Sequence, residues 1–206
     1  MMAMLRCSAC HDRDDRASNW PELLAEEGAL GLPPEKIPSL TWTGEKLRSE
    51  WLEALLEGRI TARPRPWLTA RMPAFHGFGK GLANGLAAEH GVSTQSESSA
   101  TPLGTLDRQF AEQLLSKNGL DCRQCHAPAD EVLDDKNQAQ GIGLSMIGDR
   151  LREEYYYRWM RNPLRIDPAT KMPQFTLDGK TTQASHIAGG DAARQFQALW
   201  KYLQNL

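Results

Sequence analysis

The chain has 206 residues and a nearly balanced charge, with 24 Lys and Arg against 26 Asp and Glu. This length allows one large domain or two small ones. The balanced charge and the lack of a basic tail exclude the usual pattern of a nucleic-acid-binding protein, so we expect no nucleic-acid partner. The longest apolar runs are too short to cross a bilayer, so we expect no membrane span in this chain.

One short motif occurs twice, as Cys7-Ser8-Ala9-Cys10-His11 and as Cys122-Arg123-Gln124-Cys125-His126. Cys-x-x-Cys-His is the attachment signature of c-type haem. Each of the two thiols can form a thioether to a vinyl group of the porphyrin, and the imidazole that follows can bind the iron. The sequence therefore predicts two covalently attached haem c groups. Their ligands from the chain would be Cys7, Cys10, Cys122 and Cys125 on the porphyrins, with His11 and His126 on the irons.

A Cys-x-x-Cys pair can also be half of a zinc site or a thiol–disulfide pair. Zinc needs four ligands placed together, whereas the two pairs lie far apart in the sequence. A thiol–disulfide pair does not require the histidine that follows each motif. Both pairs are followed at once by His and together use all four cysteines, which favours haem.

The chain repeats itself, and the repeat indicates two domains of one kind. Residues 40–51 align without a gap with residues 144–155 at their Leu, Gly, Leu, Arg and Glu positions. Further on, Arg71-Met72-Pro73-Ala74-Phe75 matches Lys171-Met172-Pro173-Gln174-Phe175. The stretch between the halves is rich in Ser and Thr and has no apolar period. We therefore expect a first domain over residues 1–92, a linker over 93–105 and a second domain over 106–206.

The aligned segments also predict helices, because apolar residues recur there every four positions. We expect Thr43 to cap the first helix and Gly58 to end it, and we expect Pro163 to end the second. The two apolar faces consist of Leu47, Trp51 and Leu55 in the first half and Leu151, Tyr155 and Trp159 in the second.

Three more helices are predicted, over Asp107–Lys117, Asp191–Leu206 and Gly81–His90. Phe110, Leu114 and Leu115 of one should pack on Phe196, Trp200 and Leu203 of another. No segment alternates at the period of a strand over a useful length, so we expect an all-α fold.

In these motifs and their order the chain resembles class I cytochrome c, duplicated as in the tandem dihaem cytochromes c. The resemblance covers nearly the whole chain. It implies a helix before each motif, a middle helix over the haem, a methionine-bearing loop and a C-terminal helix. It also implies that Met72 and Met172 are the distal iron ligands. A thioether ligand stabilises ferrous iron and raises the reduction potential relative to a second imidazole.

Three histidines are rivals for these positions: His76 and His90 near Met72, and His186 near Met172. Their ordinary interpretation is surface or hydrogen-bonded histidine. The middle helices suggest haem contacts through Trp51 and Tyr155, for which plain helix packing is the alternative. Arg48 and Arg152 occupy equivalent places and suit the haem carboxylates, although solvated surface charge explains them equally well.

The family's proximal His donates its second ring N–H to a proline carbonyl before the middle helix. Pro38 is the candidate in the first half, and Ile142 stands at the equivalent place in the second. The first half also departs from the family because only Met1–Arg6 precede its motif, too few for a leading helix. We therefore expect Leu82 and Leu86 to lack cover, which would favour a homodimer or cover from residues upstream.

These features predict an electron carrier that passes single electrons between redox partner proteins, and no catalysis by this chain alone. The alternatives are a dihaem peroxidase, in which one iron must be open to peroxide, and a haem-based redox or gas sensor. In the family haem is attached outside the cytoplasm, and this sequence begins without a signal peptide. We therefore expect it to be part of a larger periplasmic or otherwise exported protein.

Overall fold

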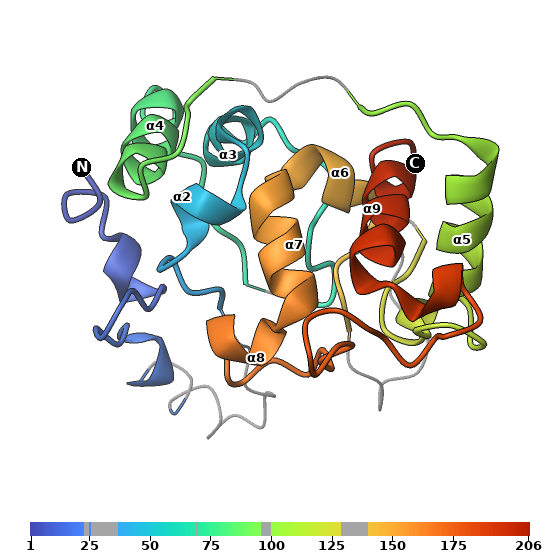
Figure 1. Cartoon of the computed structure of the whole chain (residues 1–206). Helices are drawn as coiled ribbons and strands as arrows, with labels where there is room; N and C mark the ends of the chain where they lie inside the picture. The colour runs from blue at the N-terminus through green and yellow to red at the C-terminus, as the bar shows by residue number, and fades with distance from the viewer. Residues whose placement is uncertain (23–24, 26–36, 69, 96–99, 129–139) are drawn as a thin grey trace. The chain divides into compact units, whose positions relative to one another are not determined.

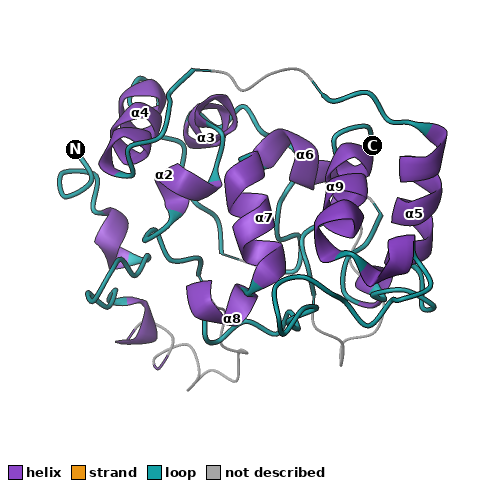
Figure 2. Ribbon diagram, in the orientation of Figure 1, coloured by secondary structure: helices purple, strands orange, loops and turns teal. Residues whose placement is uncertain are grey.

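The computed structural model describes residues 1–22, 25, 37–68, 70–95, 100–128 and 140–206, and these residues form helices joined by loops (Figures 1 and 2). Across those ranges there is no β-strand, which confirms the all-α prediction. None of the helices in the same ranges is both long enough and apolar enough to span a membrane.

The chain divides into two compact units, Met1–Thr61 with Leu68–Ser96 and Ala62–Trp67 with Glu97–Leu206. The first contains the 3₁₀ turn η1 (Cys7–Ala9) and helices α2 (Thr43–Lys46), α3 (Ser49–Leu56) and α4 (Gly79–Glu89). The second contains α5 (Thr105–Leu115), η2 (Cys122–Gln124), η3 (Leu144–Met146), α6 (Ile147–Arg150), α7 (Glu153–Arg161), α8 (Pro163–Ile166), η4 (Ala188–Gly190) and α9 (Ala192–Leu203).

Each predicted middle helix is two helices with an extended break between them, so the single-helix prediction was wrong. In the first unit Leu47 (ψ 140°) and Arg48 (ψ 138°) are extended between α2 and α3. Thr43 is the first residue of α2 and makes no capping bond, because Trp42 is the N-cap. The second unit has the same break at Leu151 and Arg152, between α6 and α7.

A close approach of two backbones explains the short helix before each break. A Cβ atom at Gly44 in α2 would collide with the carbonyl group of Leu86 in α4. At the aligned position, a Cβ on Gly148 in α6 would lie 2.5 Å from the carbonyl oxygen of Leu203 in α9. Only glycine permits such contacts, and the same contact in both units shows that the sequence repeat is also a structural repeat.

In the first unit α4 packs against α2 and α3 (Figure 1). Leu82 and Leu86 are 5% and 6% exposed, so the prediction that they lack cover was wrong. Met1 also lies against α4, since its Cε is 3.2 Å from the place of a Cβ on Gly81. The premise of the homodimer prediction is thereby removed, because this apolar surface is already buried within the chain.

The core of the second unit is built where α5 and α7 pack on α9. The predicted contacts are confirmed, because one cluster contains Leu114, Leu115, Phe196, Trp200 and Leu203 with Phe110 against it. Tyr156 of α7 donates its hydroxyl hydrogen bond to the carbonyl oxygen of Phe196 at 3.0 Å. Its ring lies 4.8 Å from that of Trp200.

Proline ends α7 as predicted and also begins the next helix. Arg161 is the last residue of α7, and Pro163 is the first residue of α8, a position where its missing N–H is not needed. The side chain of Asn162 caps α8 by accepting from the backbone N–H of Arg165 at 3.1 Å. The chain thus turns sharply before it reaches the loop that carries Met172.

Candidate functional site

The two Cys-x-x-Cys-His motifs fold in the same way, although they lie in different units. The residue before each first cysteine has a left-handed backbone, with φ 54° at Arg6 and 55° at Asp121. A 3₁₀ turn follows, and the backbone N–H of His11 or His126 donates to the carbonyl of the first cysteine at 3.0 or 2.9 Å. A left-handed non-glycine residue is strained, and such strain concentrates at functional sites.

Both histidines of the motifs are oriented by a hydrogen bond to a backbone carbonyl. Nδ1 of His11 lies 2.7 Å from the carbonyl oxygen of Pro38, and Nδ1 of His126 lies 2.8 Å from that of Ile142. These hydrogen bonds confirm the predicted pairs. Because a carbonyl can only accept, Nδ1 carries a proton, and Nε2 is then the nitrogen whose lone pair binds a metal in the neutral ring.

Burial favours the neutral form of the His126 ring. It lowers the pKa of His126, and the hydrogen bond to Ile142 opposes this effect only in part, so the ring is neutral at pH 7. Gly141 covers the ring closely, because a Cβ at this position would lie 2.5 Å from Nδ1 and 2.6 Å from Cε1 of His126. The backbone N–H of Gly141 also donates to the carbonyl of Cys125 at 2.6 Å.

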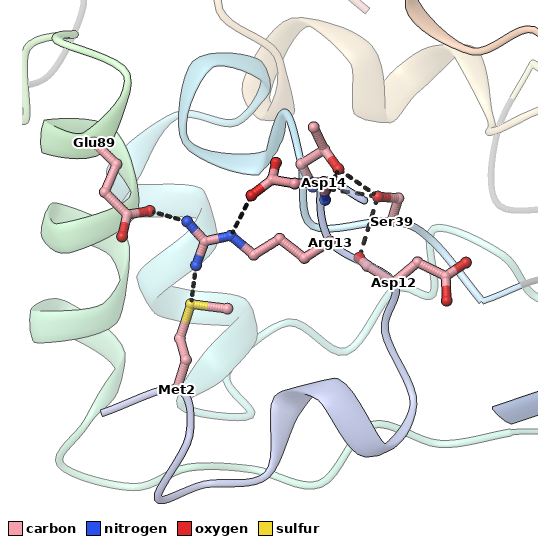
Figure 3. Close-up of polar contacts among 7 residues, drawn as sticks. Met2, Asp12, Arg13, Asp14, Ser39 and Glu89 are labelled. Atoms are coloured by element: carbon pink, nitrogen blue, oxygen red, sulfur yellow. Dashed lines mark hydrogen bonds and ion pairs between the residues drawn. The ribbon is translucent and has the colours of Figure 1, made fainter. Parts of the chain in front are cut away.

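The segment after the first motif is fixed by Arg13 (Figure 3). Its guanidinium donates to Glu89 of α4 at 2.6 Å and to the sulfur of Met2 at 3.0 Å. The backbone carbonyl of Asp12 accepts from the backbone N–H of Leu40 at 2.8 Å. The motif is therefore attached on one side to the residues that follow Pro38 and on the other to α4.

The four cysteines are half-buried and form no disulfides. Burial raises the pKa of Cys122 to about 12 and also raises that of Cys7. Reactive redox cysteines and zinc ligands need thiolates, which environments with a lowered pKa supply. The thiols of Cys7 and Cys122 are instead kept protonated, which speaks against the zinc and thiol–disulfide alternatives at these two residues.

The two methionines differ in how firmly they are held. Met172 is half-buried against the core of the second unit, where Cys122 also packs. Its sulfur accepts a hydrogen bond from the indole N–H of Trp159 at 2.8 Å, and its backbone N–H donates to Thr170 Oγ1 at 3.2 Å. The Met72 residue is 42% exposed.

The rival histidines have partners or positions of their own. The side chain of His76 is 80% exposed, with Nδ1 3.9 Å from a carboxylate oxygen of Glu57. The His90 ring lies 6.0 Å from that of Trp42. His186 is exposed. All three therefore have surroundings typical of surface histidines, the ordinary interpretation of the sequence.

The aromatic residues of the middle helices lie on a face of their own. In α3 the buried core positions are Leu52 and Leu56, whereas Trp51 is half-buried on the neighbouring face. In α7 Tyr155 is only 2% exposed and stacks on the half-buried Trp159, with 6.1 Å between ring centroids. Each unit thus combines a core face with a second apolar face that a flat aromatic group suits.

The second unit contains buried arginines, and the sequence reasoning found only one of them. Arg152 is 3% exposed and Arg150 is 6% exposed, while Arg48 of the first unit is half-buried. Burial and the positive charge of Arg65 lower the pKa of Arg150 to about 9, and burial lowers that of Arg65. The available signal was the repeat, since a basic residue, Lys46, aligns with Arg150.

Arg65 and Arg150 lie near enough for their like charges to interact, so an anion bound beside them would offset this repulsion. The Nε atom of Arg150 is buried with no hydrogen-bond partner. In the described part of the chain, no three His, Cys, Asp or Glu side chains gather as a metal site. An iron bound by one His and one Met does not need such a group.

Comparison of the chain with models of known protein families, with curated proteins and with solved structures finds no match.

Proposed function

We propose that this chain is an electron-transfer protein that holds two covalently attached haems, one in each unit. Haem supplies reversible one-electron chemistry at its iron. The chain supplies the thiols of Cys7 and Cys10 in one unit and those of Cys122 and Cys125 in the other. Single electrons would pass between redox partner proteins, in the periplasm or another exported compartment.

The residues around each motif are suited to bind the iron and to cover the porphyrin. In His11 and His126 the Nδ1 atom is engaged with a carbonyl oxygen at 2.7 and 2.8 Å, which leaves Nε2 of each ring as the nitrogen that can bind iron. Met72 and Met172 are the proposed opposite ligands. Trp51 and Tyr155 lie on the second apolar face of their helices and would exclude water from the porphyrin.

The buried arginines suit the anionic end of the same group. Arg150 and Arg152 are more than nine-tenths buried, and Arg65 acts on Arg150 through its charge. Haem carboxylates would offset this positive charge, and Arg48 would serve in the same way in the first unit. An orphaned buried Nε on Arg150 is the kind of donor that a carboxylate completes.

The observation that carries the proposal is that two distant copies of one motif share a single local geometry. The same left-handed residue, 3₁₀ turn and histidine–carbonyl bond occur in both units. A chance Cys-x-x-Cys-His would have no reason to reproduce the orientation of its imidazole. The orientation matches that of a histidine whose free nitrogen binds a metal.

The test is expression in a bacterium that carries the machinery for haem c attachment. We expect two haems per chain that resist acid–acetone extraction, and low-spin spectra in both oxidation states. The double variant Cys7→Ala/Cys10→Ala should retain one haem, and Cys122→Ala/Cys125→Ala should retain the other. Zinc bound in place of haem, or a chain without covalent haem under these conditions, would overturn the proposal.

One observation favours a second candidate, an enzyme or sensor with an open iron in the first unit. Met72 is 42% exposed, whereas Met172 is fixed by Trp159 and Thr170. A ligand as exposed as Met72 could be displaced from the iron by peroxide or a gas. A high-spin ferric component at neutral pH, or carbon monoxide binding by the reduced protein, would favour this candidate over a simple carrier.

A further inference from the structure

The two units differ at one position that bears on Met72 and Met172. Trp159 in α7 donates its indole N–H to the sulfur of Met172 at 2.8 Å. The sequence repeat places Leu55 of α3 at the aligned position in the first unit. Leucine has no hydrogen to donate, so this position cannot give the sulfur of Met72 the same hydrogen bond.

The donor and the acceptor of this hydrogen bond are each held by a contact of their own. The Trp159 ring stacks on that of Tyr155, with 6.1 Å between centroids and 20° between planes. Tyr155 is 2% exposed, so the ring on which Trp159 stacks is itself buried. The backbone of Met172 is held separately by Thr170, so the N–H and the sulfur are oriented toward each other by independent contacts.

A hydrogen bond of this kind changes how well a sulfur donates to a metal. A thioether sulfur has two lone pairs, so one can accept from an N–H while the other binds iron. The N–H withdraws electron density from the sulfur, and its positive end points at the atom that would bind the iron. Both effects oppose ferric iron more than ferrous iron, because the ferric ion carries one more positive charge.

We propose that Trp159 is a positioning residue that gives the haem of the second unit the higher reduction potential, so that the first electron to enter the protein rests there at equilibrium. This inference depends on the proposed function. In the step concerned, the first iron goes from ferrous to ferric and the second from ferric to ferrous. One electron moves and no proton. The electron is supplied by a one-electron reductant protein and leaves to an oxidant of still higher potential.

The experiment is a spectroelectrochemical titration of the two-haem protein with Trp159→Phe, which keeps a flat ring and removes the N–H. We expect the second haem to become easier to oxidise, with up to a tenfold change in the equilibrium between the haems. That factor corresponds to about 59 mV for a one-electron couple. This change is expected if the hydrogen bond contributes a net free energy of about 1.4 kcal/mol to the ferrous state and nothing to the ferric state. The first haem should keep its potential.

Two further variants separate the hydrogen bond from general loosening of the core. Trp200→Phe removes an indole from the same core whose Nε1 is buried without a hydrogen-bond partner, and it should leave both potentials unchanged. Leu55→Trp places a donor at the aligned position and should raise the potential of the first haem. An equal fall of the second potential in Trp159→Phe and Trp200→Phe would overturn the proposal.

The near-infrared band of methionine sulfur bound to ferric iron distinguishes failure here from failure of the proposed function. Trp159→Phe should keep this band with a shifted maximum, and Met172→Ala should remove the contribution of the second haem. If the band persists and the potentials of Trp159→Phe equal those of the parent protein, Met172 binds the iron but Trp159 does not tune it. If Met172→Ala changes neither band nor potential, the ligation itself is wrong.

Discussion

The carbonyl oxygen of Ile142 accepts from Nδ1 of His126 at 2.8 Å, as that of Pro38 accepts from His11 at 2.7 Å. A proline side chain is therefore not what this hydrogen bond requires. The backbone must bring a carbonyl to the ring at a fixed place. In the second unit Gly141, the residue before Ile142, allows this approach because a side chain there would collide with His126.

The first prediction concerns this glycine. Gly141→Ala should displace the His126 ring, because the new Cβ would lie 2.5 Å from Nδ1 and 2.9 Å from the carbonyl oxygen of Cys125. We expect haem content to fall from two per chain toward one, with the spectrum of the first haem retained. The control is Gly104→Ala, where the nearest atom to a new Cβ is 3.9 Å away. Full haem content in Gly141→Ala would contradict the role given to His126.

Local signals in the sequence predicted where helices lie, although not the breaks in the middle helices. The histidine partners were predicted from the family resemblance, which the repeat carried from one half to the other. Apolar period, proline at position 163 and the order of the motifs are all visible along the chain. The repeat also placed Ile142 opposite His126 without any proline to mark it. Alignment of the two halves was therefore more informative than the residue type at a single position.

The break between α2 and α3 could not be predicted, because no local signal marks it. Neither Leu47 nor Arg48 is a glycine or a proline, and helical period continues through both. The break accompanies packing between segments far apart in the sequence, because Gly44 of α2 lies close to the backbone of Leu86 in α4. Arg65 was missed for the same reason, since its proximity to Arg150 arises only from the fold.

The second prediction tests this packing in the first unit. Gly44→Ala should destabilise the protein by about 1–3 kcal/mol, because the added methyl group would meet backbone atoms that cannot rotate away. Gly85→Ala is the matched control in the same unit, since no atom lies within 4 Å of its Cβ. It should stabilise α4 by about 0.5–1 kcal/mol. Urea denaturation measures both, and equal effects would contradict the packing argument.

The third prediction concerns pH. Glu57 accepts from the backbone N–H groups of Gly77 at 3.0 Å and Gly79 at 2.7 Å, and these bonds lower its pKa below the ordinary value of 4.5. The folded state therefore prefers the ionised carboxylate. Its contribution to stability is present above pH 4.5 and is lost as the pH falls through the lower folded pKa.

Glu57→Gln should accordingly lower the denaturation midpoint of the first unit at pH 7. The gap between this variant and the parent protein should shrink as the pH falls below 4.5 and through the lower folded pKa. Glu50→Gln, an exposed residue of the same helix, should lower the midpoint less at every pH. A gap that stays constant across this range would mean that the charge of Glu57 plays no part.

The last prediction separates stability from function at Arg150. This guanidinium is 6% exposed and lies near Arg65, so burial and repulsion both disfavour its charge. Replacing buried charged side chains by apolar side chains of similar volume is often neutral or stabilising, by up to about 4 kcal/mol. Arg150→Met should therefore raise the urea midpoint of the protein prepared without haem, whereas the exposed Arg165→Met should leave it unchanged.

In the protein with haem, Arg150→Met should impair function although it stabilises the haem-free chain. Loss of a positive charge beside the haem carboxylates would stabilise ferric iron and lower the reduction potential of the second haem. Arg165→Met should have a smaller effect, because solvent screens its charge. If Arg150→Met instead destabilises the haem-free protein and leaves the potential unchanged, Arg150 is a structural residue of the core. The group at Arg65, Arg150 and Arg152 would then not be a site for carboxylates.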